Sequence, residues 1–309
     1  MSTEVTVPRI RGAKGSGERL VMLTAYDAPG ARIAAQAGVD LILVGDSMAM
    51  VVLGYDDTLQ VDVDDMAHHT AAVRRGLRDT GHRPLVVADM PWLSYHTGTA
   101  DAVRNAATLI RAGAQAVKLE GGGKRTAVIE ALVDAEIPVV GHLGLTPQSL
   151  HAFGGFKVQA RALEGVRQLL DDARAVTAAG CFAVVLEGLP SEVAALVTDT
   201  VEIPTIGIGA GVDCDGQVLV FHDLLGFEDR ITPRFVRRYA RLGDDAVQAV
   251  SAWAADVRSR NFPGPSESYH LSAAVAAELA DAGATLELPT RDRDDIAGRR
   301  SAGGAARAS

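Results

Sequence analysis

Ionisable side chains follow the apolar residues of several short, strand-like runs, and their types suit acid–base and metal-ion chemistry. They are Asp46, Asp89, Lys118, Glu120, His142 and Glu187. In the run "AVKLE", Lys118 and Glu120 share one face of an extended strand because side chains alternate. That face must therefore meet something polar, which is either a structural ion pair or a functional site.

Three of these groups are carboxylates that come from neighbouring runs: Asp46, Asp89 and Glu120. Placed together, they would repel one another unless a cation lay between them. Oxygen ligands without cysteine favour Mg²⁺, or Mn²⁺, over zinc. For each carboxylate taken alone, a hydrogen-bonded loop cap is the alternative.

Lys118 and Glu187 suggest two further roles. A lysine beside carboxylates stays protonated, so Lys118 suits a substrate carboxylate. An imine-forming lysine is the alternative, but it needs a lowered pKa that these anions oppose. Glu187, two runs beyond the metal candidates, is the candidate general base.

Eight apolar runs must position these residues, and most are followed by a stretch of helical spacing. They are Leu20–Tyr26, Leu41–Ser47, Leu85–Pro91, Ala116–Gly122, Pro138–Gly144, Ala183–Leu189, Pro204–Ala210 and Gln217–Leu224. This alternation predicts an α/β fold, the (βα)8 barrel; an open doubly wound sheet is the alternative. The ionisable residues would then meet at the carboxyl ends of the strands, above inward-facing residues such as Ile42 and Val44.

The pattern predicts a catalytic barrel domain at 1–265 with an N-terminal extension before Leu20. A helix is expected from Arg234 to Arg260, ended by "NFPGP". The segment 266–309 is predicted to be a C-terminal extension that is largely disordered, since it is poor in large apolar side chains.

The composition narrows the classes of partner. A net charge of −9 argues against nucleic acid and against an anionic membrane surface, so small-molecule substrates are expected. No apolar segment has the length of a signal peptide or of a membrane span, which predicts a cytoplasmic protein. Cys181 and Cys214 fit neither a disulfide framework nor a zinc site and are interpreted as free thiols.

An ordered series of motifs resembles the ketopantoate hydroxymethyltransferase family. It includes "VMLTAYDAPGARIA", "AGVDLILVGDS", "VVADMP", "AVKLEGG", "GHLGLTPQS", "VVLEGLP" and "IPTIGIGAG", and it covers roughly residues 5–269. The resemblance implies a (βα)8 enzyme of pantothenate synthesis. Such an enzyme transfers a one-carbon unit from 5,10-methylenetetrahydrofolate to 3-methyl-2-oxobutanoate, through a Mg²⁺-stabilised enolate, and forms 2-dehydropantoate.

The same resemblance implies a role for each site residue. Asp46 and Asp89 match direct Mg²⁺ ligands that also contact substrate, and Glu120 matches the third carboxylate of the metal site. Ser47 and Lys118 match residues that hold the keto acid, Glu187 matches the proton acceptor, and His142 is expected to orient substrate or relay a proton. A homodecamer is also implied.

Two rival functions remain. One is a Mg²⁺-dependent C–C lyase of the phosphoenolpyruvate mutase/isocitrate lyase type of barrel, which also binds 2-oxo acids on a carboxylate-held metal. Neither the reactive cysteine loop nor the phosphate-binding arginines typical of those enzymes is evident. The other is a binding protein without activity, which would not be expected to keep every proposed ligand and the base.

Overall fold

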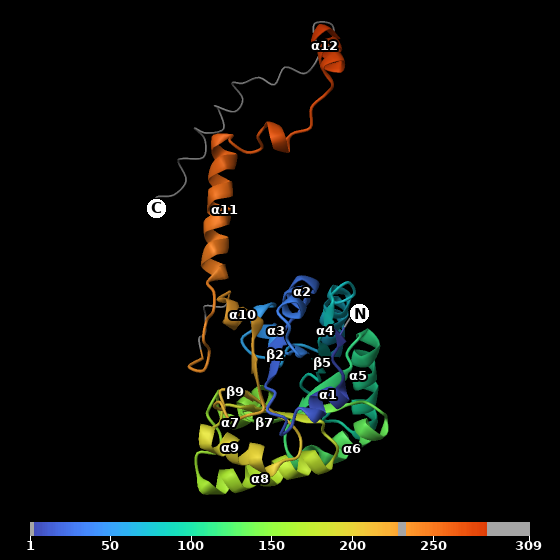
Figure 1. Ribbon diagram of the computed structural model, residues 1–309, viewed down its shortest axis with the longest axis vertical. Coiled ribbons are helices and arrows are strands. Elements are labelled where there is room, and N and C mark those ends of the chain that lie inside the picture. The colour runs from blue at the N-terminus through green and yellow to red at the C-terminus, as the bar shows by residue number, and fades with distance from the viewer. Residues whose placement is uncertain (1–2, 228–232, 283–309) are drawn as a thin grey trace, which may run out of the picture. The chain divides into compact units, whose positions relative to one another are not determined.

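Eight parallel strands form a closed barrel in the computed structural model, which describes residues 3–227 and 233–282 (Figure 1). The strands are β2 (Leu20–Thr24), β3 (Leu41–Val44), β5 (Leu85–Asp89), β6 (Ala116–Glu120), β7 (Val139–Gly144), β8 (Ala183–Glu187), β9 (Thr205–Ile208) and β10 (Gly216–Leu219). Each pairs with its neighbours in chain order, and β10 closes the barrel against β2. The predicted (βα)8 barrel and its eight strands are confirmed.

Helices follow most of the barrel strands, and α2, α4, α5, α6, α8 and α9 form a ring in which each contacts the next. The α-helices are α1 (Val7–Gly12), α2 (Ala28–Gln36), α3 (Met48–Val51), α4 (Val63–Gly76), α5 (Thr99–Ala112), α6 (Thr126–Asp134), α7 (Leu150–Phe153), α8 (Leu163–Ala178), α9 (Ser191–Thr200), α10 (Phe221–Leu225), α11 (Leu242–Ser259) and α12 (Ala273–Ala282). Short 3-10 helices are η1 (Gly123–Arg125), η2 (Pro147–Ser149) and η3 (Pro265–Glu267). None of the helices in the described part of the chain combines the length and apolar character needed to cross a membrane.

The N-terminal extension packs at the end of the barrel opposite the carboxyl ends of the strands. It contains β1 (Thr3–Glu4), which pairs with β4 (His82–Arg83), and α1. Ile10 of α1 belongs to the same buried cluster as Leu20 and Leu41 at the starts of barrel strands. Lys14 then forms an ion pair of 2.9 Å with Asp215, just before β10. These contacts cover the amino ends of the strands and leave the other end for a site.

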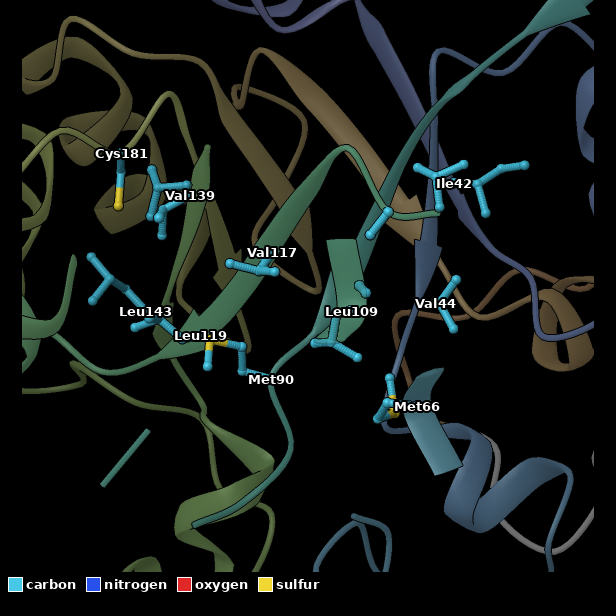
Figure 2. Close-up of a cluster of buried hydrophobic side chains, with 14 of the residues drawn as sticks. Ile42, Val44, Met66, Met90, Leu109, Val117, Leu119, Val139, Leu143 and Cys181 are labelled. Carbon is cyan, nitrogen blue, oxygen red and sulfur yellow. The ribbon is translucent and has the colours of Figure 1, made fainter. Parts of the chain in front are cut away.

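Two apolar layers alternate along the strands. Leu41, Leu43, Val87 and Ala116 pack together inside the barrel. Ile42, Val44, Val117 and Leu119 belong instead to the outer layer beneath the helices (Figure 2). The prediction that Ile42 and Val44 face inward is therefore wrong, because the register pairs inward Leu43 with inward Val87.

Two predicted elements differ most from the structure at one of their ends. The last run was expected to be strand through Leu224, but β10 ends at Leu219 and α10 covers Phe221–Leu225. The helix expected from Arg234 begins only at Leu242. The first difference arises because a short apolar segment fits either a strand or a helix by composition. Cys181 and Cys214 are buried and free, as predicted.

The chain divides into two compact units, with the boundary after Asp245. The domain boundary expected at residue 265 stays a prediction. Within the C-terminal extension at 266–309, η3 and α12 were not expected. The disorder predicted for the end of the chain falls on 283–309, which lies outside the described residues.

Candidate active site

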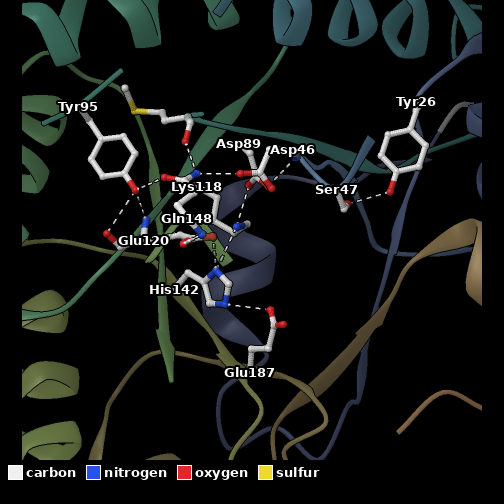
Figure 3. Close-up of polar contacts among 11 residues, drawn as sticks. Tyr26, Asp46, Ser47, Asp89, Tyr95, Lys118, Glu120, His142, Gln148 and Glu187 are labelled. Carbon is white, nitrogen blue, oxygen red and sulfur yellow. Dashed lines mark hydrogen bonds and ion pairs between the residues drawn. The ribbon is translucent and has the colours of Figure 1, made fainter. Parts of the chain in front are cut away.

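The carboxyl ends of four adjacent strands bring ionisable residues to one mouth of the barrel. Asp89 ends β5, Lys118 and Glu120 lie at the end of β6, His142 lies in β7, and Glu187 ends β8. The register places Asp89 beside Lys118 and Glu120 beside His142. Neighbouring parallel residues in register point to the same face, so all five side chains project into the mouth (Figure 3). The structure brings these residues together, as the sequence analysis predicted.

Asp46 reaches this mouth through a turn rather than through its strand. β3 ends at Val44, and the chain then turns at Gly45. A Cβ on Gly45 would lie 2.8 Å from Ser47 Oγ, so a side chain there would collide with the turn. The backbone N–H of Asp46 donates to Asp89 Oδ2 over 3.0 Å. Asp46 and Asp89 are therefore adjacent, although continued alternation along β3 would have pointed Asp46 to the opposite face of the sheet from Asp89.

Ser47 lies at the edge of the mouth and contacts Tyr26, two residues after the end of β2. Ser47 Oγ and the Tyr26 hydroxyl are 2.9 Å apart. Ser47 is partly exposed, whereas Tyr26 is buried, and burial raises the pKa of the Tyr26 phenol above its ordinary value. Tyr26 therefore stays neutral and holds the Ser47 hydroxyl in one place.

Lys118 is the buried cation of the cluster. Its Nζ forms an ion pair of 2.9 Å with Asp89 Oδ1 and lies 3.2 Å from His142 Nδ1. Burial disfavours the charged amine, but Asp89, Glu120 and Asp46 together raise the pKa of Lys118. The ammonium form therefore persists at neutral pH, which argues against an imine-forming lysine.

His142 links the metal-site candidates to the candidate base. Its Nε2 lies 3.2 Å from Glu187 Oε2, and its Nδ1 lies 3.5 Å from Glu120 Oε1. Burial and Lys118 lower the pKa of His142, but the nearby Glu120 and Glu187 carboxylates outweigh them and raise it to about 9. His142 is thus placed to carry a proton between two carboxylates.

The acidic side chains outnumber the cations that face them. Asp46, Asp89 and Glu120 are each at most 4% exposed. Burial, then repulsion from Asp89 and Glu120, raises the pKa of Asp46 well above its usual range. Burial also raises the pKa of Asp89, although Lys118 opposes this. A further cation would relieve this excess of buried negative charge, and oxygen donors of this kind fit Mg²⁺.

The carboxylates do not by themselves surround a point where an ion could sit. Among residues 3–227 and 233–282, no three His, Cys, Asp or Glu side chains are arranged to hold a metal ion. Lys118 and an amide, Gln148, lie among the acidic groups. The carboxylate oxygens are of the kind that binds Mg²⁺. In this structure, Lys118 and Gln148 contact them instead.

Two neutral residues of the site were not assigned by the sequence analysis. Gln148, in η2 after β7, contacts Asp46 and Glu120, and Tyr95, after β5, contacts Gln148. Both are buried. The available signal was the position of Gln148 in "GHLGLTPQS", a polar residue shortly after a strand that carries His142.

Comparison with known proteins identifies relatives along nearly the whole chain. A family model described as ketopantoate hydroxymethyltransferase matches residues 4–265. A 3-methyl-2-oxobutanoate hydroxymethyltransferase of Syntrophobacter fumaroxidans is 50% identical over 281 residues, which cover 91% of this chain and 98% of that protein. In Bradyrhizobium diazoefficiens, 3-methyl-2-oxobutanoate hydroxymethyltransferase 2 is 55% identical, covering 86% of this chain and 90% of its own length.

More distant solved structures share the barrel. A phosphonopyruvate hydrolase solved with oxalate and Mg²⁺ has a TM-score of 0.55 at 14% identity and covers 91% of this chain and 97% of its own. A 2,3-dimethylmalate lyase, a member of the phosphoenolpyruvate mutase/isocitrate lyase superfamily, has a TM-score of 0.51 at 15% identity, covering 96% and 98% of the two chains. At these identities the likeness establishes the fold alone.

Proposed function

The chain belongs to the ketopantoate hydroxymethyltransferase family, and we propose that the polar mouth of its barrel is where hydroxymethyl transfer to 3-methyl-2-oxobutanoate takes place. The protein is an enzyme of this transferase class. We take 5,10-methylenetetrahydrofolate as the one-carbon donor and 2-dehydropantoate as the product. The electrophile is either the folate iminium or formaldehyde released in the site.

The reaction first needs a base at C3 of the keto acid. Glu187 fits this task because it stands at the mouth with 16% of its side chain exposed, whereas Asp46, Asp89 and Glu120 are almost fully buried. Removal of a proton beside a ketone leaves negative charge on the ketone oxygen. Glu187 Oε2 is kept 3.2 Å from Nε2 of His142, which orients the carboxylate.

The other residues hold the keto acid and balance its charge. Lys118 supplies the fixed positive charge for the substrate carboxylate, and Ser47 supplies a hydroxyl at the edge of the mouth. Asp46 and Asp89, with Glu120 beside them, would hold Mg²⁺. The ion would supply Lewis acidity at the ketone oxygen and the adjacent carboxylate.

One observation carries this proposal. A continuous series of contacts runs from Asp46 to Asp89, Lys118, His142 and Glu187 within the barrel mouth (Figure 3). The acidic end suits a cation and the Glu187 end suits a base. A 2-oxo acid bridging the two ends would present its ketone to one and its C3 hydrogen to the other.

Exchange of the C3 hydrogen of 3-methyl-2-oxobutanoate in D₂O tests substrate, metal and base together. We expect the wild-type protein to exchange this hydrogen with Mg²⁺ and to lose exchange when the metal is chelated. Glu187→Gln should lower the exchange rate by at least about 100-fold, since a general base contributes roughly that much. Keto acid binding, measured by calorimetry, should be retained.

The control is Glu192→Gln, which makes the same change on an exposed residue of α9, five positions along the chain. Its exchange rate should match the wild type. Rapid exchange by Glu187→Gln would rule out Glu187 as the base. Cleavage of an isocitrate-like acid, with no exchange of 3-methyl-2-oxobutanoate, would instead support the C–C lyase alternative.

We further propose that the enzyme works in the cytoplasm on small molecules and assembles as a homodecamer. Its net charge of −9 disfavours nucleic acid and anionic membranes as partners. Sedimentation of the purified protein measures the assembly directly.

A further inference from the structure

Gln148 connects two of the three acidic groups at the proposed cation site. Its side-chain Nε2 donates to Asp46 Oδ2 over 2.8 Å and to the carbonyl of Met90 over 2.9 Å. Its backbone N–H donates to Glu120 Oε2 over 3.0 Å. The residue is 7% exposed, so water does not compete freely for these contacts.

Tyr95 fixes which way the Gln148 amide points. The Tyr95 hydroxyl donates to Gln148 Oε1 over 2.6 Å and accepts from the backbone N–H of Glu120 over 3.2 Å. Burial, then the charge of Glu120, raises the pKa of Tyr95 well above its usual range, so the hydroxyl keeps its proton. The amide NH₂ must then face Asp46 and Met90, because its oxygen is already engaged.

Tyr95 is itself closely surrounded by other side chains. It is 1% exposed, and the guanidinium of Arg125 lies 5.2 Å from the centre of its ring. Two direct hydrogen bonds lead from the Tyr95 hydroxyl to the Gln148 amide and then to the Asp46 carboxylate.

We propose that Gln148, held by Tyr95, is a positioning residue that fixes the carboxylate of Asp46 relative to Glu120 for divalent-cation binding. This rests on the proposed function, because it assumes that the acidic cluster binds Mg²⁺. Gln148 occupies one oxygen of Asp46 and, through its backbone, one oxygen of Glu120. The remaining oxygens are the ones available to an ion.

The nature of the residue matters as much as its place. A glutamate of the same size would set an oxygen against Asp46 and against the Met90 carbonyl, so that acceptors would face acceptors. A methionine would keep the volume of Gln148 and lose only the hydrogen bonds of the amide. The backbone bond to Glu120 would survive, so Gln148→Met removes the side-chain contacts with Asp46, Met90 and Tyr95 and keeps the one with Glu120.

The test is the affinity of the wild-type protein and of Gln148→Met for Mg²⁺, measured by calorimetry without substrate. We expect the variant to bind Mg²⁺ roughly 10- to 100-fold more weakly, the usual effect of removing a partner of a metal ligand. In C3 exchange its KM for Mg²⁺ should rise by the same factor, while kcat at saturating Mg²⁺ stays within about threefold of wild type.

The matched control is Gln217→Met. Gln217 is exposed on β10, and its Nε2 donates to the Gly211 carbonyl over 2.9 Å, so the change also removes an amide hydrogen bond. Its Mg²⁺ affinity should equal that of the wild type. A second variant, Tyr95→Phe, removes the hydroxyl that orients Gln148 and should weaken Mg²⁺ binding severalfold even if Gln148→Met fails to fold.

The outcomes separate this proposal from the function on which it rests. Normal Mg²⁺ affinity in folded Gln148→Met, or in Tyr95→Phe, overturns the positioning role while wild-type exchange still supports the function. A lower melting temperature with unchanged Mg²⁺ affinity likewise assigns Gln148 to stability alone. If the wild-type protein binds no divalent cation, both proposals fail together.

Discussion

At the scale of single residues, the charge on each group in the barrel mouth depends on its neighbours. Asp46, Asp89 and Glu120 are buried together, and Lys118 is paired with Asp89. Buried like charges are costly unless a counter-ion is bound. We therefore expect the buried carboxylates to lower the free energy of unfolding of the metal-free protein, because they are arranged for cation binding and not for stability.

Asp46→Asn tests whether the buried carboxylates lower the stability of the metal-free protein. Asparagine keeps an oxygen for the Gln148 amide but removes the charge that burial and Asp89 disfavour. The metal-free variant should be more stable to urea than the wild type, because burial and then repulsion from Asp89 raise the pKa of Asp46 and so disfavour its charged form. Calorimetry should at the same time show loss of Mg²⁺ binding.

The comparison for Asp46→Asn is Asp101→Asn on α5, where the carboxylate is exposed and paired with Arg104. Removing that surface pair should leave the free energy of unfolding nearly unchanged, because exposed ion pairs contribute little. A metal-free Asp46→Asn protein less stable than the wild type would show that Asp46 is not under electrostatic strain.

Cys181 gives a prediction for alkaline pH. The thiol is 2% exposed, and burial raises its pKa from 9.0 to about 12. Because the folded pKa is the higher one, the unfolded chain loses its proton first. The associated stability is complete below about pH 9 and is lost as pH rises towards 12.

Urea unfolding at pH 8 and pH 10 measures this effect. Between these two values the wild type should lose about 1 kcal/mol more than Cys181→Ala, which lacks the titrating group. Cys214 is present in both proteins and so cancels. Equal losses would mean that the Cys181 thiol is not shielded from water in the folded state.

The charged site residues could be found from sequence, whereas their neutral partners could not. Asp89, Lys118, Glu120, His142 and Glu187 each follow apolar residues of the same strand, which fixes both their face and their end of the barrel. Gln148 and Tyr95 lie in connections between elements. Their contacts depend on how those connections fold back, and neither residue type signals chemistry by itself.

At the scale of elements, the residue at which a strand ends determines where the following side chains point, and alternation along the sequence does not reveal that residue. The run Leu41–Ser47 reads as one strand, and alternation then places Asp46 on the face of Ile42 and Val44. That inference fails for the two apolar residues, which the register places in the outer layer. Asp46 reaches the mouth because β3 ends at Val44 and the chain then turns at Gly45. Residue type and run length identified the eight strands, but the turn at Gly45 depends on tertiary contacts with Asp89.

Close packing of α4 against the start of α2 gives an element-scale prediction. A Cβ on Gly76 would lie 2.5 Å from the Ala28 carbonyl oxygen and 2.7 Å from its Cα. Since backbone atoms cannot rotate away, Gly76→Ala should force the helices apart and cost about 1–3 kcal/mol in the free energy of unfolding. Urea denaturation measures it.

Gly12→Ala is the control for Gly76→Ala. Gly12 is also the last residue of a helix, but a Cβ there meets nothing within 4 Å. This substitution should leave stability unchanged or raise it by up to about 1 kcal/mol, because it restricts the unfolded chain. If both variants behaved alike, the approach of α4 to α2 would not be tight.

At the scale of the whole molecule, α11 presents an apolar stripe to solvent in the single chain. Val247, Val250, Trp253 and Val257 recur at spacings of three and four residues, and each is at least 44% exposed. Such spacing places them on one side of a helix. A continuous apolar stripe exposed on a single chain commonly marks a protein interface. A second copy of this chain is the expected partner, because a homo-oligomer is proposed.

Val250→Glu tests whether this stripe is covered in the assembly. A carboxylate in the middle of a subunit interface would be buried without a partner, so the variant should sediment as a smaller species than the wild type at equal concentration. Gln248→Glu adds the same charge to the other side of α11 and should sediment like the wild type. Far-ultraviolet circular dichroism should be unchanged in both, since Val250 is already 61% exposed in the single chain and contributes little to its core. Unaltered sedimentation of Val250→Glu would mean that the subunits meet through other surfaces, and the stripe would then need a different partner.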